Sequence, residues 1–453
     1  MADNFESHFN WNLDSDVARI DRTQIQEKLL ARIESDVTLK GKTHLLLSYM
    51  FAKNDVTGTV DFNKALVYTD GAMTSPDFSA GEKWLAKVNK SFILRELMQD
   101  EESLRLRSEA KTEFTSMADA EKATLILCKV FAISTLKTRA HDDVIACCDE
   151  VLRYNDECGE ALLFKARGLT MRNKRRMMND EEEHCYDLAA RFWPDSPLPL
   201  VYKAHAFLYN IHFQNVATKV RQQIFQKADD LVDVGKSMAV EKRHSHALKE
   251  CAAIDRLKIS VLFAVDKRKA IKNIDRLTAR QKDSIERAKE MDPRNSQILR
   301  EYARFYAYNS IYKDASIASK GFKEAVEYAT NDTEKLAAKV DLICHTTAQS
   351  EDYDSKLQQL QDMIPDFDNE ELKIEIRNKM AFCYMDELKD FHRAYDVIST
   401  TLEQFKIMLP SSSKMVLSLF IKNLQKADRA GNHQQLLLQA KQLMAAYFPE
   451  ENQ

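Results

Sequence analysis

Apolar residues recur along most of the chain at the spacing of an amphipathic α-helix. Ile285, Ala288 and Met291, for example, form one helical face before the segment ends at Asp292-Pro293. No stretch alternates apolar and polar residues as a half-buried strand does, and prolines lie between the periodic segments. The pattern therefore predicts an all-α fold.

Three of the predicted helices repeat one another. Segments 127–130, 163–166 and 201–204 superpose, and they begin 36 and 38 residues apart. The intervening helices close in polar or proline turns, at 155–156, 193–196, 292–295 and 331–333. Two antiparallel helices in roughly 34 residues, followed by such a turn, are the tetratricopeptide pattern. We predict a tetratricopeptide-repeat superhelix, an α-solenoid of antiparallel helix pairs.

The repeats also suggest how the chain is organised. We expect an N-terminal superhelix over 1–235, long central helices over 236–340 and C-terminal repeats with capping helices over 341–453. Residues 215–280 fit the repeat least well, and we interpret them as longer helices. Small residues stand where paired helices must approach closely: Ala146, Ala166, Gly168, Ala189, Ala288, Ala303, Ala325 and Ala381. Such a solenoid presents a concave face that usually binds a partner.

Composition narrows the class of protein. Glycine (9) and proline (8) are scarce among 453 residues, which disfavours sandwiches, barrels and disordered polymers. No apolar run approaches the roughly 18 residues of a membrane span, and the N-terminus lacks the regions of a signal peptide. The eight cysteines show no CxxC pair and no zinc-ligand spacing. We expect a cytoplasmic protein with reduced thiols and no zinc.

Charge is unevenly distributed along the chain. The net charge is -4, yet residues 201–300 contain 21 Lys+Arg and only 12 Asp+Glu. This local excess permits a basic surface on an acidic protein. Solvated helix faces would explain the excess equally well.

The search for catalytic motifs finds nothing. The sequence has no phosphate-binding GxxxxGK[ST] loop, no GxGxxG, no GxSxG and no HExxH. The histidines are scattered, and acidic runs such as Glu181-Glu182-Glu183 are typical of a solvated helix start. We therefore expect no enzymatic activity and no cofactor.

Basic residues on the first helices of the predicted pairs are better candidates for function. Arg300 and Arg304 are one turn apart and project to one side of a helix that also carries Tyr302, Phe305 and Tyr306. Guanidinium groups bind phosphate, and aromatic rings stack on bases. Alternatively, the rings belong to the core and the arginines to a solvated edge. Further basic residues lie on the first helices of preceding pairs: Lys137, Arg167 and Arg172. A basic run also precedes Arg300 in sequence: Lys267, Arg268, Lys269, Lys272, Arg276 and Arg280.

Three stretches resemble the interferon-induced proteins with tetratricopeptide repeats, a family of cytosolic antiviral RNA binders. Residues 5–13, FESHFNWNL, are close to that family's His-Phe-x-Trp-x-Leu element. Residues 298–306, ILREYARFY, look like its Val-Leu-Arg-Tyr-Ala-x-x-Phe-Tyr helix, and residues 377–398 are similar to a C-terminal repeat. The resemblance is spread over most of the chain, which is diverged and about one repeat short.

The resemblance implies a basic tunnel that holds single-stranded RNA by a 5′-triphosphate or a cap. Arg300 falls on the family's phosphate-contacting arginine, Lys137 on a pocket lysine, and Arg172 within one position of a pocket arginine. Two family tyrosines are replaced by Gln297 and Glu301, although Tyr302 follows. Lys28 and Lys339 stand near polar positions of the family and would restore positive charge. Together with Arg304, they complete the candidate RNA-binding set.

Two main functions follow from this reading. The first is a cytoplasmic RNA-binding protein of innate immunity that sequesters or senses 5′-phosphorylated RNA, with no membrane partner and with other tetratricopeptide proteins as possible partners. The second is a protein-interaction scaffold that uses the concave face. A regulatory subunit of a larger complex is a third interpretation. A basic, closed inner surface favours RNA, whereas an open groove of mixed charge favours a protein partner.

Overall fold

The computed structural model describes residues 29, 40–52, 60–136, 141–172, 177–212, 218–265, 267–329, 332–350, 352–367, 370–405, 411–427 and 433–448. Within these ranges the chain forms helices and no strands, so the all-α prediction is confirmed. The chain divides into two compact units, 1–293 and 294–453. The three-part division expected from the sequence stays a prediction.

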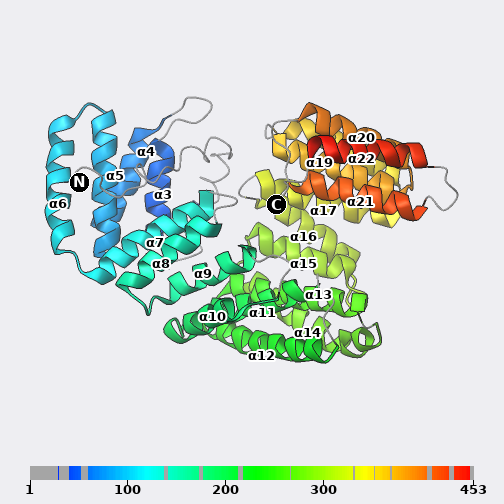
Figure 1. Ribbon diagram of the computed structural model, residues 1–453, viewed down its shortest axis with the longest axis horizontal. Helices are drawn as coiled ribbons and strands as arrows, with labels where there is room; N and C mark the ends of the chain where they lie inside the picture. Colours follow the sequence, from blue (N-terminus) through cyan, green and yellow to red (C-terminus); the bar gives the residue numbers. More distant parts are fainter. Residues whose placement is uncertain are drawn as a thin grey trace. The chain divides into compact units, whose positions relative to one another are not determined.

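The first unit is built from helices that mostly pack against the next one in the chain, except that α7 packs against α5 and not against α6 (Figure 1). They are α3 (Lys40–Ala52), α4 (Phe62–Thr74), α5 (Ala80–Glu96), α6 (Asp100–Ser116), α7 (Asp119–Leu136), α8 (His141–Tyr154), α9 (Gly159–Arg172), α10 (Asp180–Phe192), α11 (Leu198–His212), α12 (Thr218–Glu241), α13 (Ser245–Val265) and α14 (Lys267–Met291).

The second unit follows the same plan. It contains α15 (Ser296–Tyr308), α16 (Ala315–Glu327), α17 (Asp332–Ser350), α18 (Tyr353–Met363), α19 (Glu370–Phe382), α20 (Phe391–Gln404), α21 (Ser411–Ala427) and α22 (Gln434–Tyr447). A 3₁₀ turn, Ile364–Asp366, follows α18, and a π-helical turn, Cys383–Glu387, follows α19.

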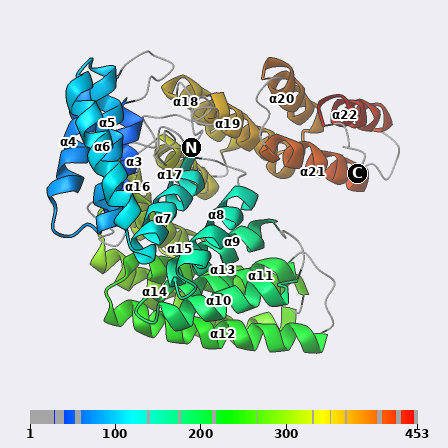
Figure 2. The ribbon, with the colours of Figure 1, turned by 60° about the vertical axis from the view of Figure 1, so that its left-hand side comes forward.

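The repeat predicted from the sequence is confirmed in α7, α9 and α11, which are the first helices of successive pairs. First helices also touch one another, α9 with α11 and α11 with α13 (Figure 2 shows the same stack from another side). In tetratricopeptide arrays this layer lines the concave face. The layer is therefore where a ligand site is expected.

The repeated lysine in these first helices holds the pairs together. Lys165 of α9 lies 2.8 Å from Asp149 of α8 and 3.2 Å from Glu181 of α10. Lys203 of α11 lies 2.6 Å from Asp187 of α10. Burial alone would lower the pKa of Lys165, but its hydrogen bonds to the two carboxylates raise it. These lysines are structural and are not available to a ligand.

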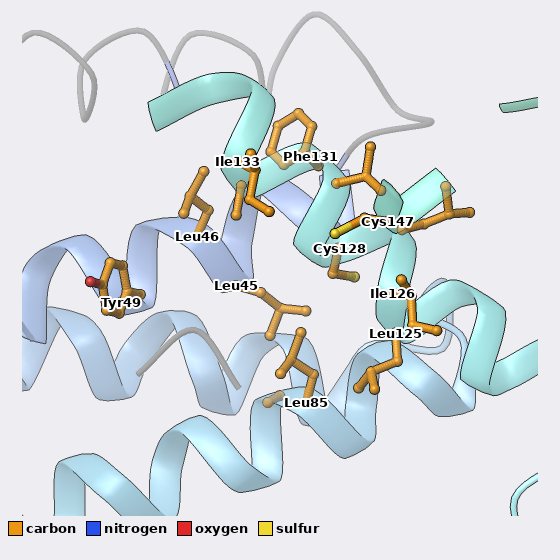
Figure 3. Packing of buried hydrophobic residues seen from close by; sticks show 14 of the residues in the cluster. Leu45, Leu46, Tyr49, Leu85, Leu125, Ile126, Cys128, Phe131, Ile133 and Cys147 are labelled. Atoms are coloured by element: carbon orange, nitrogen blue, oxygen red, sulfur yellow. The ribbon is translucent and has the colours of Figure 1, made fainter. Parts of the chain in front are cut away.

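The N-terminal core is formed by leucine, isoleucine and aromatic side chains. Leu45 of α3, Leu85 of α5 and Leu125 of α7 point into one cluster, together with Phe131 (Figure 3). Close approach of helices depends on small residues, as the sequence suggested for Gly168. A Cβ at that position would lie 3.0 Å from Cγ1 of Ile145 in α8.

The helices of the region that fits the repeat least well are longer, as expected: α12 has 24 residues, α13 has 21 and α14 has 25. A buried ionic network joins them. Arg280 of α14 donates to Asp255 of α13 at 2.9 Å and to Asp229 of α12 at 2.8 Å. Lys258 and Arg276 also reach Asp229. Two basic residues of the run noted in the sequence, Arg276 and Arg280, thus bind carboxylates of neighbouring helices.

Two further features bear on the sequence expectations. All eight cysteines are free thiols. Among the helices of the described ranges, none combines the length and apolar character that crossing a membrane requires.

Candidate functional site

Arg300 and Arg304 meet at a carboxylate of a neighbouring helix. Asn295 caps α15 by accepting from the backbone N–H groups of Gln297 and Ile298, which fixes where the helix begins. One turn apart on this helix, Nε of Arg300 lies 2.6 Å from Oδ2 of Asp341 in α17, and Nε of Arg304 lies 2.7 Å from the same oxygen. The spacing argument that placed both arginines on one side is confirmed.

The charges at this position balance. Arg304 also donates to Glu301 at 3.0 Å, so two guanidinium groups face two carboxylates. Burial would lower the pKa of Arg304, but Asp341 and Glu301 raise it. Glu301, which replaces a family tyrosine, thus points at Arg304. An incoming phosphate would compete with these carboxylates for the same donors.

The aromatic residues of α15 lie on other sides of the helix. Phe305 and Tyr306 are buried, which agrees with the core interpretation of these two rings. Tyr302 is half-buried, with its ring 4.9 Å from that of Tyr306. It lies against α16, where a Cβ on Gly321 would be 3.5 Å from its ring. Tyr302 therefore faces α16, whereas Arg300 and Arg304 face α17.

The other expected site residues are dispersed. Lys339 of α17 lies 2.6 Å from Asp366 and over the ring of Phe367. Arg172 is the last residue of α9, in the first unit, and lies 3.5 Å from the exposed Asp142. Lys28 and Lys137 lie outside the described residues. Of the expected cations that the structure describes, it therefore brings together Arg300 and Arg304 but not Arg172 or Lys339.

A second cluster lies on the stacked first helices of the first unit. The guanidinium of Arg167, in α9, lies 4.3 Å from the ring centroid of Tyr202, in α11. The hydroxyl of Tyr202 lies 3.1 Å from Nε2 of His246, in α13. The exposed guanidinium of Arg167, the ring of Tyr202 and the imidazole of His246 thus form a row across three first helices, α9, α11 and α13. We call these three residues the Arg167 platform.

The platform carries positive charge at neutral pH. Arg167 is exposed, and no carboxylate in the described ranges lies within ion-pair distance of it. Burial, with Lys249 and His244 nearby, lowers the pKa of His246 although Glu250 opposes the shift, so its imidazole is neutral and shares a hydrogen bond with the hydroxyl of Tyr202. Nζ of Lys249 lies 2.8 Å from a carboxylate oxygen of Glu250, so the charges of these two side chains cancel. An accessible guanidinium stacked on a tyrosine remains.

The repeated segments carry a positional signal for Arg167. Arg167 stands two residues after the repeated Lys165, and His205 stands two residues after Lys203. The pKa of His205 is lowered by burial, and Arg167 contributes to that lowering. This register position therefore faces the neighbouring first helix. Comparing side chains at that position would have selected Arg167.

A cavity in the described part of the chain lies away from both clusters. Its volume is about 210 Å³, and it opens between the start of α10, α11 and the start of α12, lined mainly by Met177, Met178, Phe207, Val220, Ile224 and Lys227. No group of three or more His, Cys, Asp or Glu side chains within the described ranges is arranged to hold a metal ion.

The architecture defines a tetratricopeptide-repeat α-solenoid. No protein-family model matches the chain, and no curated protein sequence matches it. Solved structures do. The chain aligns with the human IFIT1 dimer with PPP-AAAA at a TM-score of 0.59 and 13% identity, covering 98% of this chain and 93% of that one.

Two related structures give the same result. The human IFIT1 dimer with m7Gppp-AAAA aligns at a TM-score of 0.58 and 14% identity, over 98% of this chain and 93% of that chain. A monomeric IFIT1 mutant with Gppp-AAAA aligns at 0.59 and 13%, over 96% and 94%. The resemblance to the interferon-induced tetratricopeptide family is therefore confirmed at the level of the fold.

Proposed function

We propose that this chain is a cytoplasmic protein that binds single-stranded RNA by a 5′-phosphorylated end, triphosphate or cap, and does so without catalysing a reaction. In this role it sequesters or senses foreign RNA in innate antiviral defence. The human IFIT1 structures that share its fold contain PPP-AAAA and m7Gppp-AAAA. The sequence supports the non-enzymatic part, because it carries none of the common catalytic motifs.

The observation that carries the proposal is the Arg167 platform. Phosphate requires a cation whose donors are not already bound by carboxylates, and Arg167 meets this condition. A base can stack on a guanidinium plane or a tyrosine ring without regard to sequence. The platform also spans α9, α11 and α13, the first helices that line the concave face of such an array.

The scaffold alternative has support at a different position. Around Asp341, two arginines and two carboxylates balance, and a surface of mixed charge favours a protein partner over RNA. We therefore assign RNA to the first unit and regard the Arg300 region as the candidate surface for a protein partner.

Fluorescence anisotropy with short single-stranded RNAs tests the RNA proposal. The RNA carries either a 5′-triphosphate or a 5′-hydroxyl and is titrated at two salt concentrations. We expect tighter binding of the triphosphate and weaker binding at high salt, because bound phosphates release counterions. Arg167→Ala should weaken triphosphate binding about tenfold or more, since stacking and a charge-assisted bond are both lost.

Arg191→Ala is the matched control. Arg191 is also exposed and lies over a ring, that of Phe192, but it stands on α10, a second helix. Its substitution should leave RNA binding unchanged. Equal affinity of the wild-type protein for both RNAs would contradict the proposal, and so would an Arg167→Ala variant that binds like the wild type.

A further inference from the structure

One end of the three long helices is both apolar and basic. Phe225 of α12, Ile259 and Leu262 of α13, and Leu277 of α14 pack together near this end. Beyond this layer, toward the end, three apolar side chains are exposed to solvent: Val220 at 40%, Phe263 at 41% and Ile271 at 58%. They come from three different helices, so the exposure is a property of the end and not of one helix.

The cations at this end have few partners. Lys219 stands beside Val220, and Lys272 stands beside Ile271; both lysines are exposed. Within the described ranges, no carboxylate lies within ion-pair distance of either one. Arg276, one turn further into α14, is instead held by Asp229 at 2.8 Å. Among the described residues of the basic run, Arg276 and Arg280 therefore bind carboxylates of neighbouring helices, whereas Lys272 does not.

We propose that this end, defined by Lys219, Val220, Phe263, Ile271 and Lys272, is a docking surface for an anionic lipid bilayer. Lysines attract acidic headgroups, while exposed apolar side chains enter the acyl boundary. RNA fits less well, because two of the three apolar side chains are aliphatic and offer no ring on which a base stacks. This surface is independent of the Arg167 platform and changes the expectation of no membrane partner.

Vesicle co-sedimentation of the full-length protein tests the surface. The vesicles are phosphatidylcholine alone or with about one third phosphatidylserine, at low and high salt. We expect binding to the acidic vesicles only, weakened by salt. The charge reversals Lys219→Glu and Lys272→Glu, made together, should lower the partition coefficient about tenfold or more, because each lysine near an acidic surface contributes substantially.

Control variants distinguish binding at this surface from a general effect of net charge. Lys111→Glu with Lys320→Glu makes the same change in net charge at exposed positions on α6 and α16, and it should not affect vesicle binding. Ile271→Ser should weaken binding several-fold, whereas Val67→Ser, at the exposed Val67 of α4, should not. Circular dichroism confirms that each variant is folded.

Three outcomes would overturn the proposal. The first is no binding to acidic vesicles at low salt. The second is equal loss in the Lys111/Lys320 control. The third is a Lys219/Lys272 variant that keeps vesicle binding but loses affinity for a 30-nucleotide RNA, which would assign the surface to RNA. Binding of the short triphosphate RNA is followed in parallel, so that failure here is distinguished from failure at the Arg167 platform.

Discussion

At the scale of single residues, the carboxylates around an arginine decide what that arginine can do. Arg304 is held by Asp341 and Glu301, whereas Arg167 stacks on Tyr202. The two side chains look equivalent in sequence, since both stand on first helices. Only Arg167 has donors that a phosphate can use without displacing a carboxylate.

Substitution of Asp341 tests whether its ion pairs with Arg300 and Arg304 stabilise the fold. Asp341→Ala removes the acceptor shared by Arg300 and Arg304, and we expect the free energy of unfolding to fall by about 1–3 kcal/mol. The value is moderate because both arginines are partly exposed. Urea unfolding measures it. Asp341→Asn keeps an acceptor oxygen and should cost less; an alanine variant as stable as the wild type would contradict this role.

In this region the sequence predicts the relation of residues within one helix, but not the contacts between helices that are far apart along the chain. The spacing of Arg300 and Arg304 within one helix predicted correctly that they share a side. Their acceptor is 41 and 37 residues away, on a different helix, and no local pattern identifies it. Similarly, the core interpretation applied to Tyr302, Phe305 and Tyr306 alike; it is confirmed for Phe305 and Tyr306, whereas the half-buried position of Tyr302 depends on where α16 packs.

At the scale of elements, close packing of helix pairs depends on particular glycines. A Cβ on Gly159, at the start of α9, would lie 2.6 Å from Cβ of Trp193 and 2.9 Å from its backbone nitrogen. In contrast, a Cβ on Gly71 in α4 would have its nearest neighbour at 3.9 Å, in ordinary contact. The same substitution should therefore have opposite effects at the two positions.

We expect Gly159→Ala to destabilise the protein by about 1–3 kcal/mol, because the backbone at Trp193 has to move. Gly71→Ala should stabilise it by about 0.5–1 kcal/mol, since glycine inside a helix costs backbone entropy relative to alanine. Chemical denaturation of both variants measures the difference. A Gly159→Ala variant at least as stable as the wild type would show that the contact at Trp193 does not limit packing.

In the network of α12, α13 and α14, the carboxylate of Asp229 contributes a pH dependence of definite sign, opposite to that of Asp255, whose pKa is raised by burial. Burial alone would raise the pKa of Asp229, but Lys258, Arg276 and Arg280 lower it below its ordinary value. The folded state then binds this proton less readily than the unfolded state. Stabilisation by Asp229 is present above the ordinary aspartate pKa of about 4 and is lost as the pH falls below it.

Asp229→Asn should remove this dependence. The difference in unfolding free energy between wild type and variant should be largest near neutral pH and shrink as the pH falls from about 4 toward 2. Thermal unfolding at a series of pH values follows it. A difference that grows with acid would mean that the folded-state pKa of Asp229 is raised. Sequence indicated long helices here, but the charges that join them come from three separate segments.

At the scale of the whole molecule, each compact unit has hydrophobic clusters of its own. Clusters around Leu45 and around Tyr186 lie in residues 1–293, and clusters around Leu360 and around Phe420 lie in residues 294–453. Periodicity and the repeated lysine predicted the class of fold over both units. The division at Pro293-Arg294 has no comparable signal, because a proline turn also closes helices inside a unit.

Fragments of the two units distinguish an RNA site at Arg167 from the site at Arg300 that the family resemblance implies. If the Arg167 platform holds the 5′ end, a fragment of residues 1–293 should retain preference for triphosphate over hydroxyl RNA, and residues 294–453 should show none. If Arg300 is the phosphate ligand, as the family resemblance implies, the second fragment should bind instead. Circular dichroism first establishes that each fragment is helical. Anisotropy then decides, and Arg167→Ala in the first fragment and Arg300→Ala in the second assign any binding to one guanidinium. Binding only by the full chain would show that both units contribute to the site.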